Sequence, residues 1–279
     1  MDPLVFMAII AAAAMHATWN AVLKIRLDPF LALALIAGAC TVLALPVALM
    51  LGPPPAHAWL WIAASISVHI VYYLTLTSAY RIADMGLVYP LARGGSPLIT
   101  TLLSLLLLGE PIDGQGVLGV AVLAAGVLTI ALQPRGTGLD KRALILSGAC
   151  AVSIAIYSVI DGLGARSTGN AHLYAAWLFV MEGPVVVTVA LLRHGRENVA
   201  KMKSFLGPGL LGGAMALGGY WITIWAMTQA PIGLVTAVRE SSVMFAALLG
   251  IFILREPVCV RRLLGAALIV AGLALIKLQ

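Results

Sequence analysis

The sequence contains few charged residues and few cysteines. Charged side chains make up 10% of the 279 residues and hydrophobic ones 62%, a balance that excludes an ordinary soluble domain. The cysteines Cys40, Cys150 and Cys259 lack metal-like spacing, so we interpret them as small hydrophobic residues and expect no metal. The chain also lacks a nucleophile elbow, an HExxH pair and a P-loop. These absences disfavour an enzyme, a nucleotide-driven pump and a bound cofactor.

Apolar segments follow one another along the whole chain. Crossing the hydrocarbon core of a bilayer takes about 20 apolar residues, and Gly, Pro or charged residues separate such segments here. We predict an all-α, polytopic membrane protein with ten transmembrane helices. The predicted spans are Leu4–Leu23, Pro29–Leu51, Ala58–Ala79, Gly86–Leu108, Gly116–Leu132, Ala143–Leu163, Ala171–Leu192, Leu206–Gln229, Ile232–Leu254 and Val258–Leu278.

One pattern of polar residues and glycines occurs twice at a constant offset of 146 residues. The first copy is Arg93, Glu110-Pro111, Gly119 and Gly126, and the second is Arg239, Glu256-Pro257, Gly265 and Gly272. We infer two homologous halves, residues 1–136 and 137–279. Because each half has an odd number of spans, the second half enters the membrane in the opposite direction. The repeats are therefore predicted to be inverted.

The two arginines of this pattern are the leading candidates for a binding site. Arg93 follows Gly86 by seven residues, which places it roughly 10 Å below the membrane surface if the segment is helical. A charge at that depth is costly and indicates a polar cavity. With Arg239 entering from the opposite face, the two would flank a central site for an anion, helped by a helix N-terminus at a Gly94-Gly95 break. Structural ion pairs, Arg93 with Glu240 or Arg239 with Glu182, are the alternative.

Further candidate binding residues lie at helical spacing on other predicted spans. They are His16, Trp19 and Asn20 in the first span, His69, Tyr72 and Tyr73 in the third, Tyr89 near Arg93, Tyr157 in the sixth, and Tyr220 and Trp221 in the eighth. Such stripes also occur in helix packing. Glu182, Glu240 and Asp161 are candidates for charge pairing or for binding a coupling proton. For Asp161, a solvated helix end is the alternative.

The chain resembles the EamA branch of the drug/metabolite transporter superfamily. The resemblance depends on the ten-span inverted repeat, on the string from His16 to Lys24, and on the Gly-Glu-Pro and Arg-Glu-Pro sequences that end spans four and nine. It implies a multi-pass transporter of the inner membrane. It also implies that helices one, three and four of each half surround a central substrate cavity.

Two orientations of the chain in the membrane remain open. Of the basic residues in the predicted loops, only Arg166 and Lys277 share the side of the termini. The positive-inside rule then places both termini outside the cytoplasm. Members of the resembled family commonly have cytoplasmic termini.

We expect a secondary transporter that moves a small polar metabolite by alternating access, with proton coupling as an option. The expected substrate is an organic anion or zwitterion, such as an amino acid or a phosphonate. Export of amphipathic drugs and flipping of a lipid-linked sugar are alternatives, and a membrane enzyme is less favoured. Expected partners are the substrate, protons and membrane lipids. Nucleic acid is not expected, since no basic stripe with interleaved aromatics is present, and a chain with both halves needs no second copy, so we expect a monomer.

Overall fold

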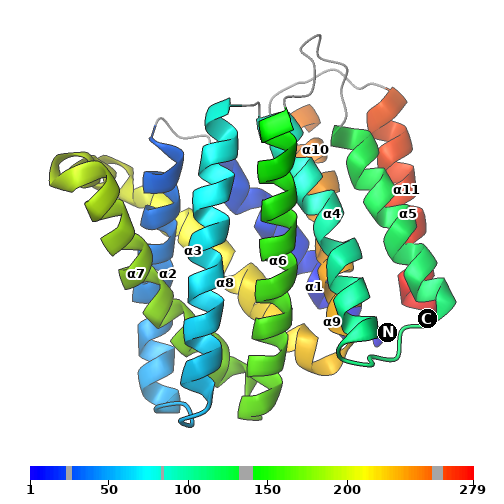
Figure 1. Ribbon diagram of the computed structural model, residues 1–279, viewed down its shortest axis with the longest axis horizontal. Helices are drawn as coiled ribbons and strands as arrows, with labels where there is room; N and C mark the ends of the chain where they lie inside the picture. The colour runs from blue at the N-terminus through cyan, green and yellow to red at the C-terminus, as the bar shows by residue number, and fades with distance from the viewer. Residues whose placement is uncertain (23–26, 83–84, 132–140, 253–259) are drawn as a thin grey trace.

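The computed structural model describes residues 1–279 except 23–26, 83–84, 132–140 and 253–259 (Figure 1). Regular structure in the described residues is entirely helical, so the predicted all-α class is confirmed. The elements are α1 Pro3–Val22, α2 Pro29–Leu51, α3 Ala58–Ile82, α4 Met85–Leu106, α5 Gly114–Ala131, α6 Lys141–Thr168, α7 Ala171–Ala200, the 3₁₀ helix η1 Lys201–Phe205, α8 Leu206–Gln229, α9 Ile232–Arg239, α10 Ser242–Phe252 and α11 Val260–Leu278.

These helices follow the predicted spans in order, with one difference. The ninth span is divided between α9 and α10. The predicted span ends Leu23, Leu132, Leu254 and Val258, and the boundary between the halves, lie outside the described residues. Apolar stretches long enough to cross a membrane are Pro3–Asn20, Pro29–Leu51, Ala58–Ile82, Lys141–Thr168 and Ala171–Gln229. The exact number of crossings stays a prediction.

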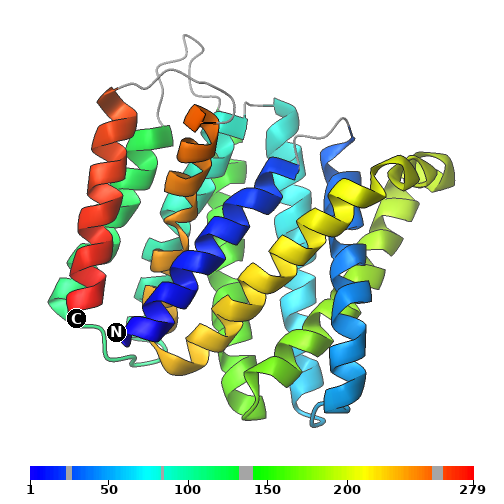
Figure 2. The same ribbon diagram turned by 180° about the vertical axis from the view of Figure 1, so that it is seen from behind.

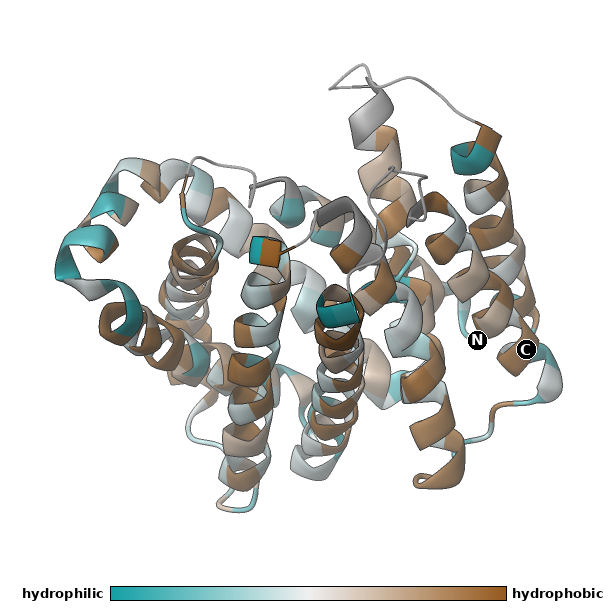
Figure 3. Cartoon of the chain, turned by 45° about the horizontal axis from the view of Figure 1, so that its top comes forward, coloured by the Kyte–Doolittle hydropathy of each residue, from teal (hydrophilic) through white to brown (hydrophobic). Residues whose placement is uncertain are grey.

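The outer faces of the helices are apolar. Leu49, Met50, Leu60 and Leu107 are among the exposed large side chains, as suits a surface in contact with lipid. Figure 3 shows hydrophobic residues along the helices and hydrophilic residues gathered at helix ends, notably around the end of α7. The fold therefore has the hydropathy of a multi-pass membrane protein.

The packing of the helices has the symmetry of an inverted repeat. In such a repeat α1 corresponds to α6, and α3 corresponds to α8. The contact of α1 with α8 is thus the counterpart of the contact of α6 with α3, and both are extensive; Figure 2 shows α1 and α8 side by side. The helices α2 and α7, and likewise α5 and α11, pack against their own counterparts.

Both termini lie at the same side of the molecule (Figure 1). The Met1 ammonium group donates a hydrogen bond to the carbonyl oxygen of Gln279 at 2.6 Å. This arrangement agrees with an even number of crossings. The side with the termini is called the terminal side below.

Glycines at matched positions of the two repeats form the contact between α5 and α11. A Cβ atom built on Gly126 would lie 2.7 Å from the carbonyl oxygen of Gly265, and one built on Gly119 would lie 3.0 Å from that of Gly272. Each pair is the symmetric counterpart of the other. The repeated glycines therefore allow two backbones to approach closely.

Replacing Gly126 by alanine is expected to destabilise the protein by about 1–3 kcal/mol, because α5 and α11 must separate to accept the methyl group. The matched control is Gly148→Ala on α6, where an added Cβ would have no neighbour within 4 Å. Thermal unfolding of both purified variants in detergent measures the difference. Equal melting temperatures for the two variants would contradict the proposed close contact.

Candidate functional site

Helix α4 passes through Arg93 without interruption, from Met85 to Leu106. The predicted break at Gly94-Gly95 is therefore wrong. Pro97 has no N–H for the carbonyl group of Arg93, four residues earlier, but the Ser96 hydroxyl donates to that oxygen at 3.4 Å. The two glycines lie against side chains of α5 and α6. A local hydrogen bond and close packing thus keep the segment helical.

The break lies instead at the related position of the second repeat. Helix α9 ends at Arg239 and α10 begins at Ser242. The N–H groups of Glu240 and Ser241 donate to carbonyl oxygens three residues earlier, at 3.0 and 3.1 Å, which tightens the chain into a turn. Serine hydroxyls compete with the helical backbone for hydrogen bonds. The turn places Arg239 and Glu240 inside the molecule.

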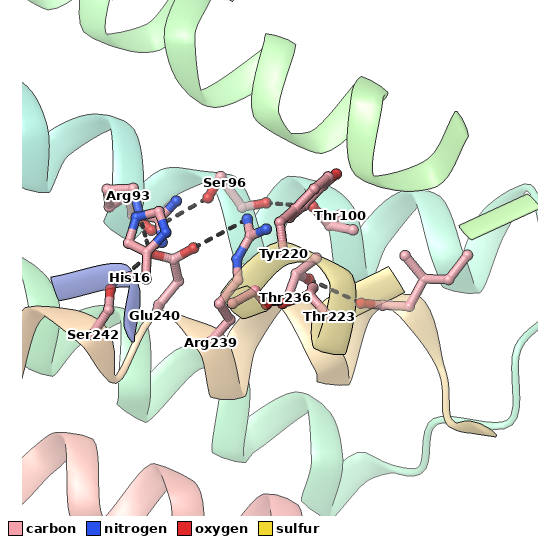
Figure 4. A network of polar contacts seen from close by, with 12 residues as sticks. His16, Arg93, Ser96, Thr100, Tyr220, Thr223, Thr236, Arg239, Glu240 and Ser242 are labelled. Atoms are coloured by element: carbon pink, nitrogen blue, oxygen red, sulfur yellow. Dashed lines mark hydrogen bonds and ion pairs between the residues drawn. The ribbon is translucent and has the colours of Figure 1, made fainter. Parts of the chain in front are cut away.

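Three charged side chains form a buried cluster at this turn (Figure 4). Nε of Arg93 lies 2.6 Å from Oε2 of Glu240, and Nη2 of Arg239 lies 3.8 Å from Oε1 of the same carboxylate. The side chains are 1%, 2% and 0% exposed for Arg93, Arg239 and Glu240. One of the two ion pairs considered from the sequence, Arg93 with Glu240, is present. The cluster has two positive charges and one negative charge.

A cavity of about 80 Å³ lies beside this cluster. It is lined by His16, Trp19, Leu33, Ile36, Ala37, Cys40, His69, Tyr72, Tyr73, Tyr157, Phe179, Glu182, Ala216, Tyr220 and Arg239. On the terminal side of the lining residues, Ile62 and Ser65 of α3 and Tyr174 and Leu178 of α7 are at most 2% exposed. Trp19, Ala216 and Tyr220 are partly exposed. The cavity therefore faces away from the terminal side.

The structure brings most of the candidate binding residues to this cavity. The lining includes His16, Trp19, His69, Tyr72, Tyr73, Tyr157, Tyr220 and Arg239, together with Glu182. It does not include Arg93, Asn20, Trp221, Asp161 or Glu240. The side chain of Tyr89 lies outside the described residues.

Two of the residues that do not line the cavity bond elsewhere. The amide of Asn20 donates to the carbonyl oxygen of His16 in its own helix at 2.8 Å. The indole N–H of Trp221 donates to Nδ1 of His172 at 2.9 Å. These donors are thus bonded to groups that do not line the cavity or to the backbone of their own helix.

Helices α2 and α7 contribute an apolar wall of the cavity that was not predicted from the sequence. The residues are Leu33, Ile36, Ala37 and Cys40 from α2, and Phe179 from α7 beside the predicted Glu182. The resemblance implied helix four of each half instead, but α4 supplies none of the described lining side chains. An apolar wall carries no polar stripe, so periodicity could not distinguish it from core. Cys40 is buried as expected, with Sγ 3.4 Å from the carbonyl oxygen of Gly213.

Tyrosines hold two buried carboxylates, one that lines the cavity and one that contacts a lining tyrosine. The Tyr73 hydroxyl donates to Oε1 of Glu182 at 2.9 Å. The hydroxyls of Tyr174 and Tyr220 donate to the two oxygens of Asp161, at 2.9 and 2.5 Å. Asp161 is fully buried, so the solvated helix end considered for it is wrong.

Aromatic rings surround the remaining polar groups of the cavity. The Arg239 guanidinium carbon lies 5.4 Å from the centroid of the Tyr220 ring, a cation–π contact. The centroids of the His69 and Tyr157 rings are 4.1 Å apart. The indole N–H of Trp19 donates to Nδ1 of His16 at 3.1 Å. Because an indole only donates, the neutral His16 ring carries its proton on Nε2.

A multi-pass helical fold with two inverted repeats around a central polar cavity is the architecture of many solute transporters. The profile of the EamA-like transporter family matches residues 3–132 and 141–278, one match in each half. The chain therefore belongs to the EamA-like transporter family of the drug/metabolite transporter superfamily, and the resemblance noted from the sequence is confirmed.

Two known proteins are similar to this chain. Protein PecM of Dickeya dadantii (strain 3937) is 23% identical to the chain over 246 residues, which cover 86% of this chain and 82% of PecM. A solved crystal structure superposes with a TM-score of 0.78 at 20% identity, covering 99% of this chain and 96% of the other. The second comparison shows the fold alone.

Proposed function

We propose that the chain is a secondary transporter that moves a small polar metabolite with an anionic group through the central cavity by alternating access. The observation that carries this proposal is Arg239. Its guanidinium lines the cavity, yet its Nε and Nη2 atoms have no hydrogen-bond partner among the residues that the structure describes. A buried guanidinium without such partners is costly. A carboxylate or phosphonate would supply charge-assisted hydrogen bonds to it.

The cluster beside the cavity increases the attraction for an anion. Glu240 is shared between Arg93 and Arg239, so one positive charge of the cluster is left without a carboxylate in it. The apolar walls of the cavity have a low dielectric constant and strengthen the electric field of this positive charge. The substrate anion would complete the neutralisation that Glu240 begins.

The lining also suits a positive group on the same substrate. Glu182 places a carboxylate at the cavity, and the tyrosine rings present faces that attract an ammonium group. An organic anion or a zwitterion, such as an amino acid or a phosphonate, therefore fits the lining best. The aromatic rings in the lining also favour one alternative function, the export of amphipathic drugs.

We propose His69 and Glu182 as the groups that bind a coupling proton. Nδ1 of His69 lies 3.7 Å from Oε1 of Glu182 and 3.3 Å from the Ser65 hydroxyl. Both residues line the cavity, so a proton and a substrate would meet in one place. We also propose that the protein acts as a monomer in the inner membrane, since both repeats of one chain build the cavity.

Transport by purified protein in lipid vesicles tests the proposal. The panel contains phosphonates, amino acids and cationic amphipathic drugs, each with and without a proton gradient. We expect accumulation of an anionic or zwitterionic compound, which is recovered chemically unchanged. Accumulation of the cationic drugs alone would favour the alternative and remove the proposed role of Arg239.

A further inference from the structure

A second polar cluster joins the two repeats at the terminal side. Glu110 follows α4, and Arg166 lies in the last turn of α6. Nη2 of Arg166 lies 2.6 Å from Oε1 of Glu110. The same guanidinium donates to the carbonyl oxygens of Met227 at 2.8 Å and Ala230 at 3.1 Å. The contact therefore connects α4 with α6 and with the junction of α8 and α9.

The carboxylate of Glu110 also caps helix α9. The N–H group of Ile232, at the start of α9, donates to Oε2 of Glu110 at 2.7 Å. The next N–H group, of Gly233, donates to the Ser104 hydroxyl of α4 at 3.0 Å. Every residue of α9 is buried, and its last residue is Arg239 of the central cavity. The Glu110 contacts thus hold the helix that carries the candidate anion-binding group.

Burial makes this ion pair different from a surface pair. The side chain of Glu110 is 6% exposed and that of Arg166 is 33% exposed. By contrast, Arg81 and Asp28, at the opposite side of the molecule, are 58% and 32% exposed and lie 3.8 Å apart. Exposed pairs contribute little, whereas removal of one partner from a buried pair leaves a charge without compensation. Loss of Arg166 would therefore favour a state in which water enters and solvates Glu110.

We propose that Glu110 and Arg166 form a latch that holds the terminal side of the central cavity closed, and that breaking it opens the cavity to that side. This inference depends on the alternating access of the proposed function. In the present state the cavity faces away from the terminal side, and the latch joins the repeats on the closed side. Release of Glu110 from Ile232 frees the start of α9, so opening is linked to movement of Arg239.

Accessibility of engineered cysteines to a membrane-impermeant thiol reagent tests the latch. Ser65→Cys on α3 places a thiol one helical turn from His69, toward the terminal side, at a position that is now buried. Ala216→Cys on α8 places a second thiol at a lining position that is partly exposed, in the half of α8 remote from the terminal side. Each reporter is used alone, with the other cysteines replaced by alanine. The protein is reconstituted in one orientation, which an N-terminal tag identifies.

Arg166→Gln is expected to speed terminal-side labelling of Ser65→Cys by about tenfold or more and to slow labelling of Ala216→Cys from the other side, as a shift between two states requires. In the double variant Glu110→Gln/Arg166→Gln no charge remains buried, so both labelling rates return toward those of the parent. The control Arg81→Gln stays within about twofold of the parent, because its ion pair is exposed.

Unchanged labelling in Arg166→Gln would overturn the latch. A double variant that labels still faster than the single one would do so as well, since it would indicate ordinary loss of packing. A rise in labelling from both sides would indicate unfolding and would also overturn it. The assay contains no substrate, so failure of the latch would leave the anion-binding role of Arg239 standing, and failure of the transport panel would leave the latch standing.

Discussion

Replacing Arg239 by methionine is expected to lower the transport of an anionic substrate by about 100-fold or more. Methionine keeps much of the apolar stem but removes the charged hydrogen-bond donors that face the cavity. Truncating one partner of a buried charge pair costs about 2–5 kcal/mol, which corresponds to a loss of this size. Arg239→Lys is expected to retain part of the activity, because lysine keeps the charge but lacks the planar fork.

The matched control for Arg239→Met is Arg193→Met. Arg193 lies at the exposed end of α7, where its guanidinium carbon is 5.5 Å from the Phe30 ring centroid, and it does not line the cavity. Initial uptake rates over a range of substrate concentrations, normalised to folded protein in the vesicles, measure both variants. We expect Arg193→Met to stay within about twofold of the parent, as surface substitutions usually do. Transport by Arg239→Met at the parental rate would refute the anion site.

The sequence predicts the helical fold well because membrane crossing imposes strong constraints on it. Long apolar segments must form helices in lipid. The repeated spacing of Arg93 and Arg239 relative to later glycines reveals the duplication. The same glycines, Gly126 and Gly265 among them, then form the contact between α5 and α11. Apolar composition and the repeated spacing were sufficient to predict the fold, because both are properties of the whole chain.

The candidate site is less predictable, because its details depend on contacts between distant residues. The sequence around Gly94 and Pro97 indicated a broken helix, but Ser96 and neighbouring helices keep α4 continuous. The equivalent segment with Glu240 contains no proline or glycine at the turn, yet it is the one that breaks. Symmetry in the sequence therefore does not extend to the roles of the two arginines. One is paired with Glu240 outside the lining, whereas the other lines the cavity.

Glu240→Gln is expected to lower the free energy of unfolding by about 3–5 kcal/mol, because it leaves two guanidinium groups buried without a carboxylate between them. This is a larger effect on stability than we expect for Gly126→Ala. The residue is fully buried, and its two oxygens face Arg93 and Arg239 respectively. Thermal unfolding in detergent, followed by the fraction that remains monodisperse on size exclusion, measures the effect. The matched control is Glu197→Gln, which removes an exposed carboxylate from α7 and should change stability by no more than about 0.5 kcal/mol.

A second variant separates loss of charge compensation from a simple defect in packing. Arg93→Met/Glu240→Gln removes both partners of the close ion pair and leaves Arg239 as the only charged residue of the cluster. Because a buried pair is often replaced by uncharged groups at little net cost, the double variant should recover most of the stability lost in Glu240→Gln. If the double variant lost as much stability as Arg93→Met and Glu240→Gln together, packing and not charge would determine the stability of the turn between α9 and α10. Recovery would instead mean that Glu240 acts as an internal anion, held between two arginines that the two repeats contribute from their fourth spans.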